Sequence, residues 1–211
     1  MGKNESKVAL TEDEIQFLKS NSKFSEEEII EWYEEFKTEN PDLKVTKSKF
    51  GEFYKDVIQG NPEKYSDRIF DVFDADKSGF LDFPEFLQCI NFVVTDNFDA
   101  KLDWTFKLYD VDGNGSIDFE EMEKILSYLC EIVHPNVQPA RVKKRAVLMF
   151  HHMDLNADGR ITKDEFVKAI KDDNEMSKII TQPVEQIAGN IVQHYNTKVK
   201  RTLFNDVLFC D

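Results

Sequence analysis

The chain has 211 residues, of which 41% are hydrophobic and 32% charged, a balance typical of a globular rather than a disordered protein. Its 41 acidic and 27 basic side chains give a formal net charge of −14, which argues against nucleic acid as a partner. No stretch approaches the roughly 18 consecutive apolar residues of a membrane span, and the N-terminus lacks the apolar segment of a signal peptide, so we expect a cytoplasmic protein.

The N-terminal sequence MGKNES fits the pattern for N-myristoylation. Removal of Met1 exposes Gly2, and Ser6 stands where the pattern favours serine or threonine. The motif alone is weak, because many chains begin with Met-Gly. One myristoyl chain binds a membrane only marginally, with a constant of about 10⁴ M⁻¹, and the negative charge of the chain opposes anionic lipid. The sequence therefore predicts covalent myristate at Gly2 and reversible attachment to the cytoplasmic face of membranes.

Two helical segments flank residues 38–49. The first, SEEEIIEWYEEFK (25–37), opens with Ser25 and Glu28 at the spacing of a capping box. The second carries an apolar stripe at helical spacing that begins at Phe50. This pattern predicts a helix, a loop at 38–49 and a second helix.

Three twelve-residue segments farther along share one pattern: DADKSGFLDFPE (74–85), DVDGNGSIDFEE (110–121) and DLNADGRITKDE (154–165). Each has oxygen-bearing side chains at positions one, three and five, glycine at six, an apolar residue at eight and glutamate at twelve. This is the pattern of the EF-hand calcium loop. The expected metal ligands are Asp74, Asp76, Ser78, Phe80, Asp82 and Glu85 in the first of these loops, Asp110, Asp112, Asn114, Ser116, Asp118 and Glu121 in the next, and Asp154, Asn156, Asp158, Arg160, Thr162 and Glu165 in the last.

The chemistry of calcium explains these residue types. Calcium takes six to eight oxygen ligands at about 2.3–2.6 Å, and position twelve supplies two of them through a glutamate. Position seven contributes only its backbone carbonyl, so Phe80 and Arg160 are compatible with binding. Leu81, Ile117 and Ile161 occupy position eight, where paired EF-hands join through a short β-bridge. The sequence therefore predicts three calcium ions.

Because EF-hands occur in pairs, three loops predict a fourth. The second and third loops begin 36 residues apart, at 74 and 110, and the same interval before 74 leads to residue 38. In segment 38–49, Pro41 stiffens the loop, Leu43 replaces the glycine and Lys49 replaces the closing glutamate. A lysine at that position repels a cation, so we expect this first hand to keep its structure and bind no metal.

Three stretches resemble the neuronal calcium sensor family, which includes recoverin-like, frequenin-like and visinin-like proteins and the guanylate cyclase activating proteins. They are EWYEEF (31–36), KLDWTFKLYDVDGNGSID (101–118) and MDLNADGRIT (153–162). The resemblance spans roughly residues 1–175, and it strengthens the expectation of myristate at Gly2. One departure is Asn40-Pro41, where the family usually carries Cys-Pro.

Together, these observations predict an all-α fold of four EF-hands in two pairs, with a degenerate first hand and a C-terminal helix. We expect the N-terminal pair at 1–95, the C-terminal pair at 96–175 and a tail with an amphipathic helix at 176–211. In that tail, apolar residues repeat at helical spacing from Val184 to Tyr195. The tail either packs permanently on the fourth hand or covers part of an aromatic groove that would bind a target.

The resemblance implies a calcium sensor that regulates a membrane-associated target, of the receptor kinase, lipid kinase, channel or guanylate cyclase class. In sensor EF-hands calcium opens the helix pair and exposes an apolar groove. The target groove is expected to be formed by nine aromatic residues: Trp32, Tyr33, Phe36, Phe50, Phe53, Phe70, Phe73, Phe83 and Phe86. The alternative is a passive calcium buffer without a dedicated target. We expect no enzymatic activity, since the sequence has no phosphate-binding glycine loop and no nucleophile–base pattern.

Overall fold

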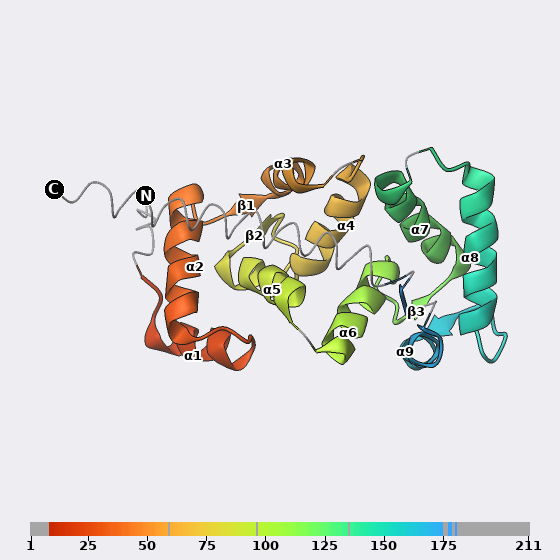
Figure 1. Cartoon of the computed structure of the whole chain (residues 1–211). Helices are drawn as coiled ribbons and strands as arrows, with labels where there is room; N and C mark the ends of the chain where they lie inside the picture. The colour runs from red at the N-terminus through yellow and green to blue at the C-terminus, as the bar shows by residue number, and fades with distance from the viewer. Residues whose placement is uncertain are drawn as a thin grey trace.

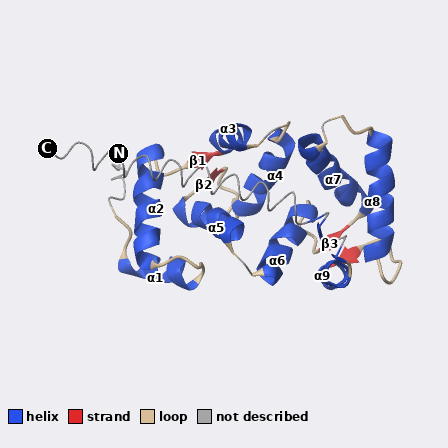
Figure 2. Cartoon of the chain, in the orientation of Figure 1, coloured by secondary structure: helices blue, strands red, loops and turns tan. Residues whose placement is uncertain are grey.

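The computed structural model describes residues 9–58, 60–95, 97–134, 136–174, 177, 178 and 180. The predicted myristoylation site at Gly2 and the helix predicted within 176–211 lie outside these residues. The described part contains nine helices: α1 Glu12–Ser20, α2 Glu26–Glu39, α3 Lys47–Val57, α4 Glu63–Phe73, α5 Phe83–Val94, α6 Phe98–Tyr109, α7 Phe119–Val133, α8 Pro139–Met153 and α9 Lys163–Asp172. Four two-residue strands connect them: β1 Val45–Thr46, β2 Phe80–Leu81, β3 Ser116–Ile117 and β4 Ile161–Thr162. The predicted all-α fold is confirmed (Figures 1 and 2).

The helices form two pairs of helix–loop–helix units, which we call the first pair (α2 to α5) and the second pair (α6 to α9). In the first pair, β1 lies antiparallel to β2, and Val45 faces Leu81. In the second pair β3 lies antiparallel to β4, and Ile117 faces Ile161. These four residues stand at position eight of their loops and are at most 7% exposed. The predicted β-bridges are therefore present in both pairs, the one containing segment 38–49 included.

Local signals place the helix starts. Ser25 and Glu28 form a capping box at the start of α2, because the Ser25 hydroxyl accepts from the Glu28 amide and the Glu28 carboxylate accepts from the Ser25 amide. Helix α2 then buries Ile29, Tyr33 and Phe36, which recur at helical spacing. None of the helices among the described residues is long and apolar enough to cross a membrane.

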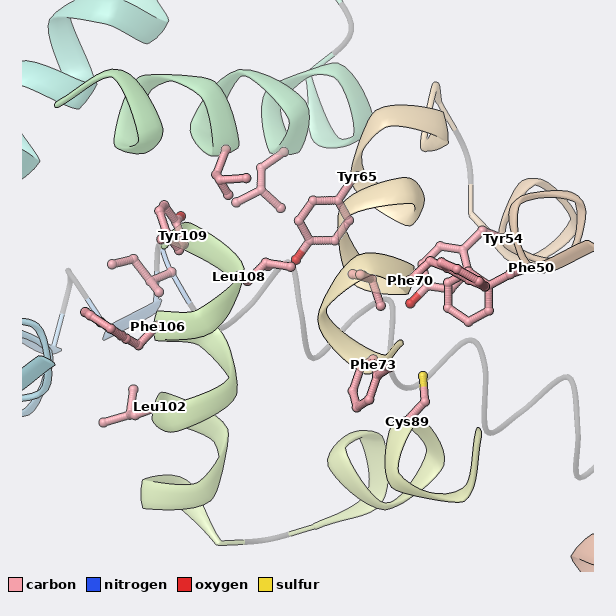
Figure 3. Packing of buried hydrophobic residues seen from close by; sticks show 14 of the residues in the cluster. Phe50, Tyr54, Tyr65, Phe70, Phe73, Cys89, Leu102, Phe106, Leu108 and Tyr109 are labelled. Carbon is pink, nitrogen blue, oxygen red and sulfur yellow. The ribbon is translucent and has the colours of Figure 1, made fainter. Parts of the chain in front are cut away.

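Helix α4 links the two pairs. It contacts α3 and α5 in the first pair and α6 and α7 in the second. Figure 3 shows that Tyr65 extends from α4 toward Leu108 of α6, whereas Phe70 faces Phe50 and Tyr54 on the other side of the helix. Tyr65 and Phe70 are at most 1% exposed. One hydrophobic core therefore runs through both pairs, and α4 packs against helices of each.

Candidate calcium sites

The second loop, residues 74–85, gathers three carboxylates. Asp74 is 5% exposed at the end of α4, and its carboxylate accepts from the amides of Ser78 and Gly79 at 2.9 and 3.0 Å. At the other end of the loop, Glu85 Oε1 accepts from the Ala75 amide at 2.9 Å. Asp74, Asp76 and Glu85 each place one carboxylate oxygen within 4.8 Å of the others. This concentration of negative oxygen atoms suits a hard divalent cation.

The third loop, residues 110–121, repeats this geometry. The Asp110 carboxylate accepts from the amides of Asn114 and Gly115, both at 3.0 Å. Glu121 Oε1 accepts from the amides of Val111 and Asp112 at 2.7 and 3.1 Å. Asp110, Asp112 and Glu121 form the second cluster of three carboxylates within 4.8 Å. Asp110 and Glu121 are each 8% exposed, so two negative charges are held in a largely dry position.

The fourth loop, residues 154–165, has the same fold but a looser set of acids. Asp154 accepts from the amides of Asp158 and Gly159 at 3.1 and 3.0 Å, as the first residue does in the other two loops. Position three is Asn156, an amide. Among the described residues, the second and third loops each contain a cluster of three carboxylates, and the fourth loop does not. We attribute this to the amide and to solvent exposure, since most of the loop is exposed.

The glutamate at position twelve also starts the exit helix. In each loop its side chain accepts from the backbone amide of position nine, the helix N-cap, whose own side chain accepts from the glutamate amide. Asp82, Asp118 and Thr162, predicted as ligands, are these N-caps. Position nine of an EF-hand often reaches calcium through water, so capping and metal binding are compatible.

The loop environment shifts the pKa values of these acids in different directions. Burial raises the pKa of Glu85, and the amides of Asp82 and Ala75 oppose the shift. Hydrogen bonds from Ser78 lower the pKa of Asp76, and those from Thr162 lower that of Glu165. The raised pKa of the half-buried Glu85 reflects desolvation and repulsion by Asp82 and Asp76, which a bound cation would relieve.

The remaining predicted ligands lie at the loop turns. Ser78 Oγ donates to the carbonyl of Phe80 at 2.9 Å, so the position-seven carbonyl and the position-five side chain lie together. Asn114 Oδ1 accepts from the Ser116 amide at 2.9 Å, and Asp158 Oδ1 from the Arg160 amide at 2.9 Å. The Arg160 guanidinium donates to Ser116 Oγ at 3.0 Å and so connects the third and fourth loops. This last contact was not expected from the sequence.

The first loop, residues 38–49, contains an ammonium group among its oxygens. Lys49 Nζ, at position twelve, donates to Asn40 Oδ1 at 2.7 Å and to the Glu39 carbonyl. Asn40 stands at position three and is 5% exposed. Leu43, at position six, has the left-handed φ of +57° that glycine adopts in the other loops. The loop therefore keeps the turn at position six and the β-bridge of the other loops, and the lysine supplies a positive charge.

Position four is a feature of the loops that the sequence did not reveal. Lys77 and Ala157 adopt left-handed φ angles of +58° and +56°, and Gly113 has +72° at the equivalent place. The first loop has Pro41 there, and the proline ring fixes φ near −65°. Only Gly113 gave a signal in the sequence, because glycine alone adopts this conformation without strain.

The aromatic residues predicted for the target groove lie at several helix contacts. Trp32 of α2 packs edge-on against Phe86 of α5, at 6.4 Å between ring centroids, and Phe36 packs against Phe86 at 5.1 Å. Phe50 of α3 lies 5.7 Å from Phe70 of α4. Seven of the nine predicted groove residues are at most 7% exposed: Tyr33, Phe36, Phe50, Phe70, Phe73, Phe83 and Phe86. Trp32 and Phe53 are partly buried.

Phe73 lies at the junction of the two pairs. Its ring stacks on Trp104 of α6 at 4.4 Å between centroids, with 23° between the planes. In this structure most of the predicted groove residues therefore belong to the core, and an exposed groove would require the helices of the first pair to move apart.

The fold and the loop geometry define an EF-hand protein with two pairs of hands. Comparison with protein-family models agrees: residues 99–171 match the EF-hand domain pair, and residues 66–91 match the EF hand domain. Neuronal calcium sensor 1 of Aplysia californica is 39% identical over 86% of this chain and 96% of its own length. Human recoverin is 30% identical over 84% of this chain and 92% of its own, and guanylyl cyclase-activating protein 1 of Gallus gallus is 32% identical over 79% and 84%. The chain belongs to the neuronal calcium sensor family.

Proposed function

We propose that this protein is a calcium sensor that binds three calcium ions, one in each of the second, third and fourth loops. The carboxylate clusters of Asp74, Asp76 and Glu85 and of Asp110, Asp112 and Glu121 carry the proposal. The fourth loop supports a third site through its shared pattern and its closing Glu165. Three divalent ions would reduce the formal net charge from −14 to −8, which accounts for much of the acidity of the chain.

The stoichiometry is tested by calcium titration in a calorimeter. We expect three ions for the wild type and two for Glu121→Gln, because the amide removes half of the two-oxygen clamp. Glu120→Gln is the matched control: Glu120 is exposed, precedes the clamp residue in the same helix and should leave three ions bound. Four ions in the wild type, or three in Glu121→Gln, would contradict the assignment of the loops.

We further propose that calcium opens the first pair and exposes the target groove, which separates a sensor from a passive calcium buffer. The aromatic side chains at the α2–α5 contact support this, because a groove that binds an apolar helix needs such side chains. Calcium should raise the fluorescence of a hydrophobic dye strongly in the wild type and much less in Glu85→Gln, which disables the calcium loop of the first pair. A protein that binds three ions without a dye response would be a buffer.

The proposed partners are a membrane surface and a membrane-associated target protein. The name guanylyl cyclase-activating protein 1 describes a relative that acts on a cyclase, which supports this class of target. Membrane attachment would use myristate on Gly2. Co-expression with an N-myristoyltransferase should add the mass of one myristoyl group, and Gly2→Ala should abolish the addition. An unmodified wild-type chain beside an acylated reference substrate would end the membrane proposal and leave the calcium sites untouched.

A further inference from the structure

Segment 60–68, which runs into and along α4, holds the ends of both helices of the third hand. The Arg68 guanidinium donates through Nε to the Leu108 carbonyl at 3.0 Å and through Nη2 to the Asp110 carbonyl at 2.7 Å. The same nitrogen also donates to the carbonyl of Lys107. Helix α6 ends at Tyr109, so these are carbonyls that the helix itself leaves without partners, at the negative end of its dipole.

The N-terminal part of the segment contacts α7, the exit helix of the third hand. Lys64 Nζ lies 2.7 Å from Glu131 Oε1, and the Asn61 amide donates to the Glu131 carbonyl at 3.5 Å. Gly60 approaches so closely that a Cβ atom there would lie 2.7 Å from the Ile132 carbonyl oxygen. The backbone of Gly60 also has a φ of +101°, which disfavours any other residue.

These two sets of contacts fix the angle between α6 and α7, the two helices of the third hand. Helix α6 is held at the end next to the calcium loop, and α7 at the end far from it. In sensor EF-hands, calcium changes the angle between the two helices by tens of degrees. A rigid α4 cannot stay in contact with the ends of both helices through such a change. Opening of the third hand must therefore break the contacts either to α6 or to α7.

The hydrogen bonds of Arg68 to the end of α6 lie next to the candidate calcium site. Asp110 is position one of the third loop: its carbonyl accepts from Arg68, and its carboxylate belongs to the cluster with Asp112 and Glu121. Burial lowers the pKa of Arg68, and the neighbouring carboxylates of Asp71, Asp110 and Glu121 oppose that shift. An arginine nevertheless stays charged. Calcium in the loop would weaken the attraction of Asp110 and Glu121 for the guanidinium, because the divalent ion offsets two carboxylate charges.

We propose that segment 60–68 is a latch on the third hand and that calcium in the third loop releases it at Arg68, which passes the signal to α4 and the first pair. The proposal rests on the calcium site proposed above. Linkage then requires the reverse effect: the closed latch lowers the calcium affinity of the third loop, and a loosened latch raises it. The Asp110 amide also donates to the Phe106 carbonyl at 2.9 Å, a hydrogen bond of the same residue that does not involve Arg68.

Trp104 provides a direct reporter of the latch. It lies on α6 and stacks on Phe73 of α4 at 4.4 Å, and it is one of only 2 tryptophans in the chain. In the full-length chain with Trp32→Phe, its emission reports the α4–α6 contact with or without calcium. Adding Glu85→Gln and Glu165→Gln disables the other two proposed sites, so that a calcium titration measures the third loop alone.

Two variants loosen the latch in different ways. Arg68→Met removes the charge and the hydrogen bonds to α6. Gly60→Ala pushes the segment away from α7 and changes no charge. In the absence of calcium both should shift Trp104 emission toward the value of the calcium-bound parent chain with Trp32→Phe, and both should raise the calcium affinity of the third loop. We expect about three- to tenfold for Arg68→Met, which also removes electrostatic repulsion, and less for Gly60→Ala.

Arg141→Met is the matched control, since Arg141 is an exposed arginine at the start of α8 and should change neither measurement. Far-UV circular dichroism shows whether each variant retains its helices, and Arg68→Lys, which keeps the charge, replaces a variant that does not fold. A lower affinity in Arg68→Met, or an affinity gain in Arg68→Met with none in Gly60→Ala, would overturn the latch. If the parent chain binds no calcium at the third loop, the proposed site fails, whereas a change in calcium-free Trp104 emission in both Arg68→Met and Gly60→Ala would still show that segment 60–68 sets the α4–α6 contact.

Discussion

At the scale of single residues, the loops depend on conformations that few side chains adopt. Position four is left-handed in the second, third and fourth loops, at Lys77, Gly113 and Ala157. A left-handed conformation costs an L-residue about 1–2 kcal/mol relative to the right-handed region. Glycine avoids the cost, and only the third loop has glycine at this place. The second and fourth loops are therefore strained even though their ligand pattern is complete.

Ala157→Gly should stabilise the calcium-free protein by about 0.5–1 kcal/mol, because Ala157 has a φ of +56° and its side chain is exposed. This corresponds to a rise in Tm of about 1–4 °C in thermal unfolding followed by circular dichroism. Ala140→Gly, in the exposed first turn of α8, is the control and should lower Tm through the poor helix propensity of glycine. A fall in Tm for Ala157→Gly as well would show that the turn carries no strain.

At the scale of elements, the first loop shows how a hand persists without a ligand set. Its strand β1 pairs with β2 in the same register that β3 and β4 use. Lys49 holds Asn40 and the Glu39 carbonyl from within the loop, so the entering and exit helices are tied together without an ion. The pair is therefore complete as a structure, and the second loop keeps the neighbour it needs.

Lys49→Met should destabilise the protein by about 1 kcal/mol, since Asn40 and the Glu39 carbonyl lose their charged donor. The number of bound calcium ions should stay as in the wild type, because the loop still lacks a glutamate at position twelve. Thermal unfolding and calcium titration check the two statements. Lys55→Met is the control: Lys55 is an exposed lysine of the same helix, and its Nζ lies 3.6 Å from a Glu63 carboxylate oxygen. This substitution should change Tm by much less, because an exposed ion pair contributes little to stability. A fourth calcium ion in Lys49→Met would mean that the lysine alone had silenced the loop.

At the scale of the whole molecule, the protein combines a strong negative charge with a continuous core. The formal net charge is −14, and the two carboxylate clusters place three acids each within 4.8 Å. The acids of each cluster repel one another in the absence of cations, while α4 packs against helices of both EF-hand pairs within the shared core. Calcium binding should therefore act on stability as well as on shape.

Removal of calcium should lower Tm, because an ion that binds only the folded state stabilises it. At a free concentration 100 times its Kd, each ion contributes about 2.7 kcal/mol. The difference in Tm between calcium and chelator should shrink by roughly a third in Glu121→Gln. Glu120→Gln should retain the full difference. An equal Tm with calcium and with chelator in the wild type would show that calcium does not bind the folded chain.

The helices, the loops and their order along the chain could be predicted from the sequence. The calcium loops are local patterns of twelve residues, so the ligand types, the glycine turns and the position-eight pairing could be read along the chain. The interval of 36 residues also located the first hand at 38, and the register of Val45 with Leu81 agrees with it. These features were predictable because each depends on residues close together in the sequence or on a repeat.

Contacts between residues far apart in the sequence, in contrast, depend on how the helices pack. Nothing in the sequence indicated that Arg68 would donate to carbonyls about forty positions away, at the end of α6. The aromatic residues of the first pair were recognised as a set, yet their burial and the stacking of Phe73 on Trp104 depend on how α4 sits between the pairs. Helical periodicity shows that a face is apolar, but it does not show which helix covers that face. That choice depends on packing across the whole core, to which every helix contributes.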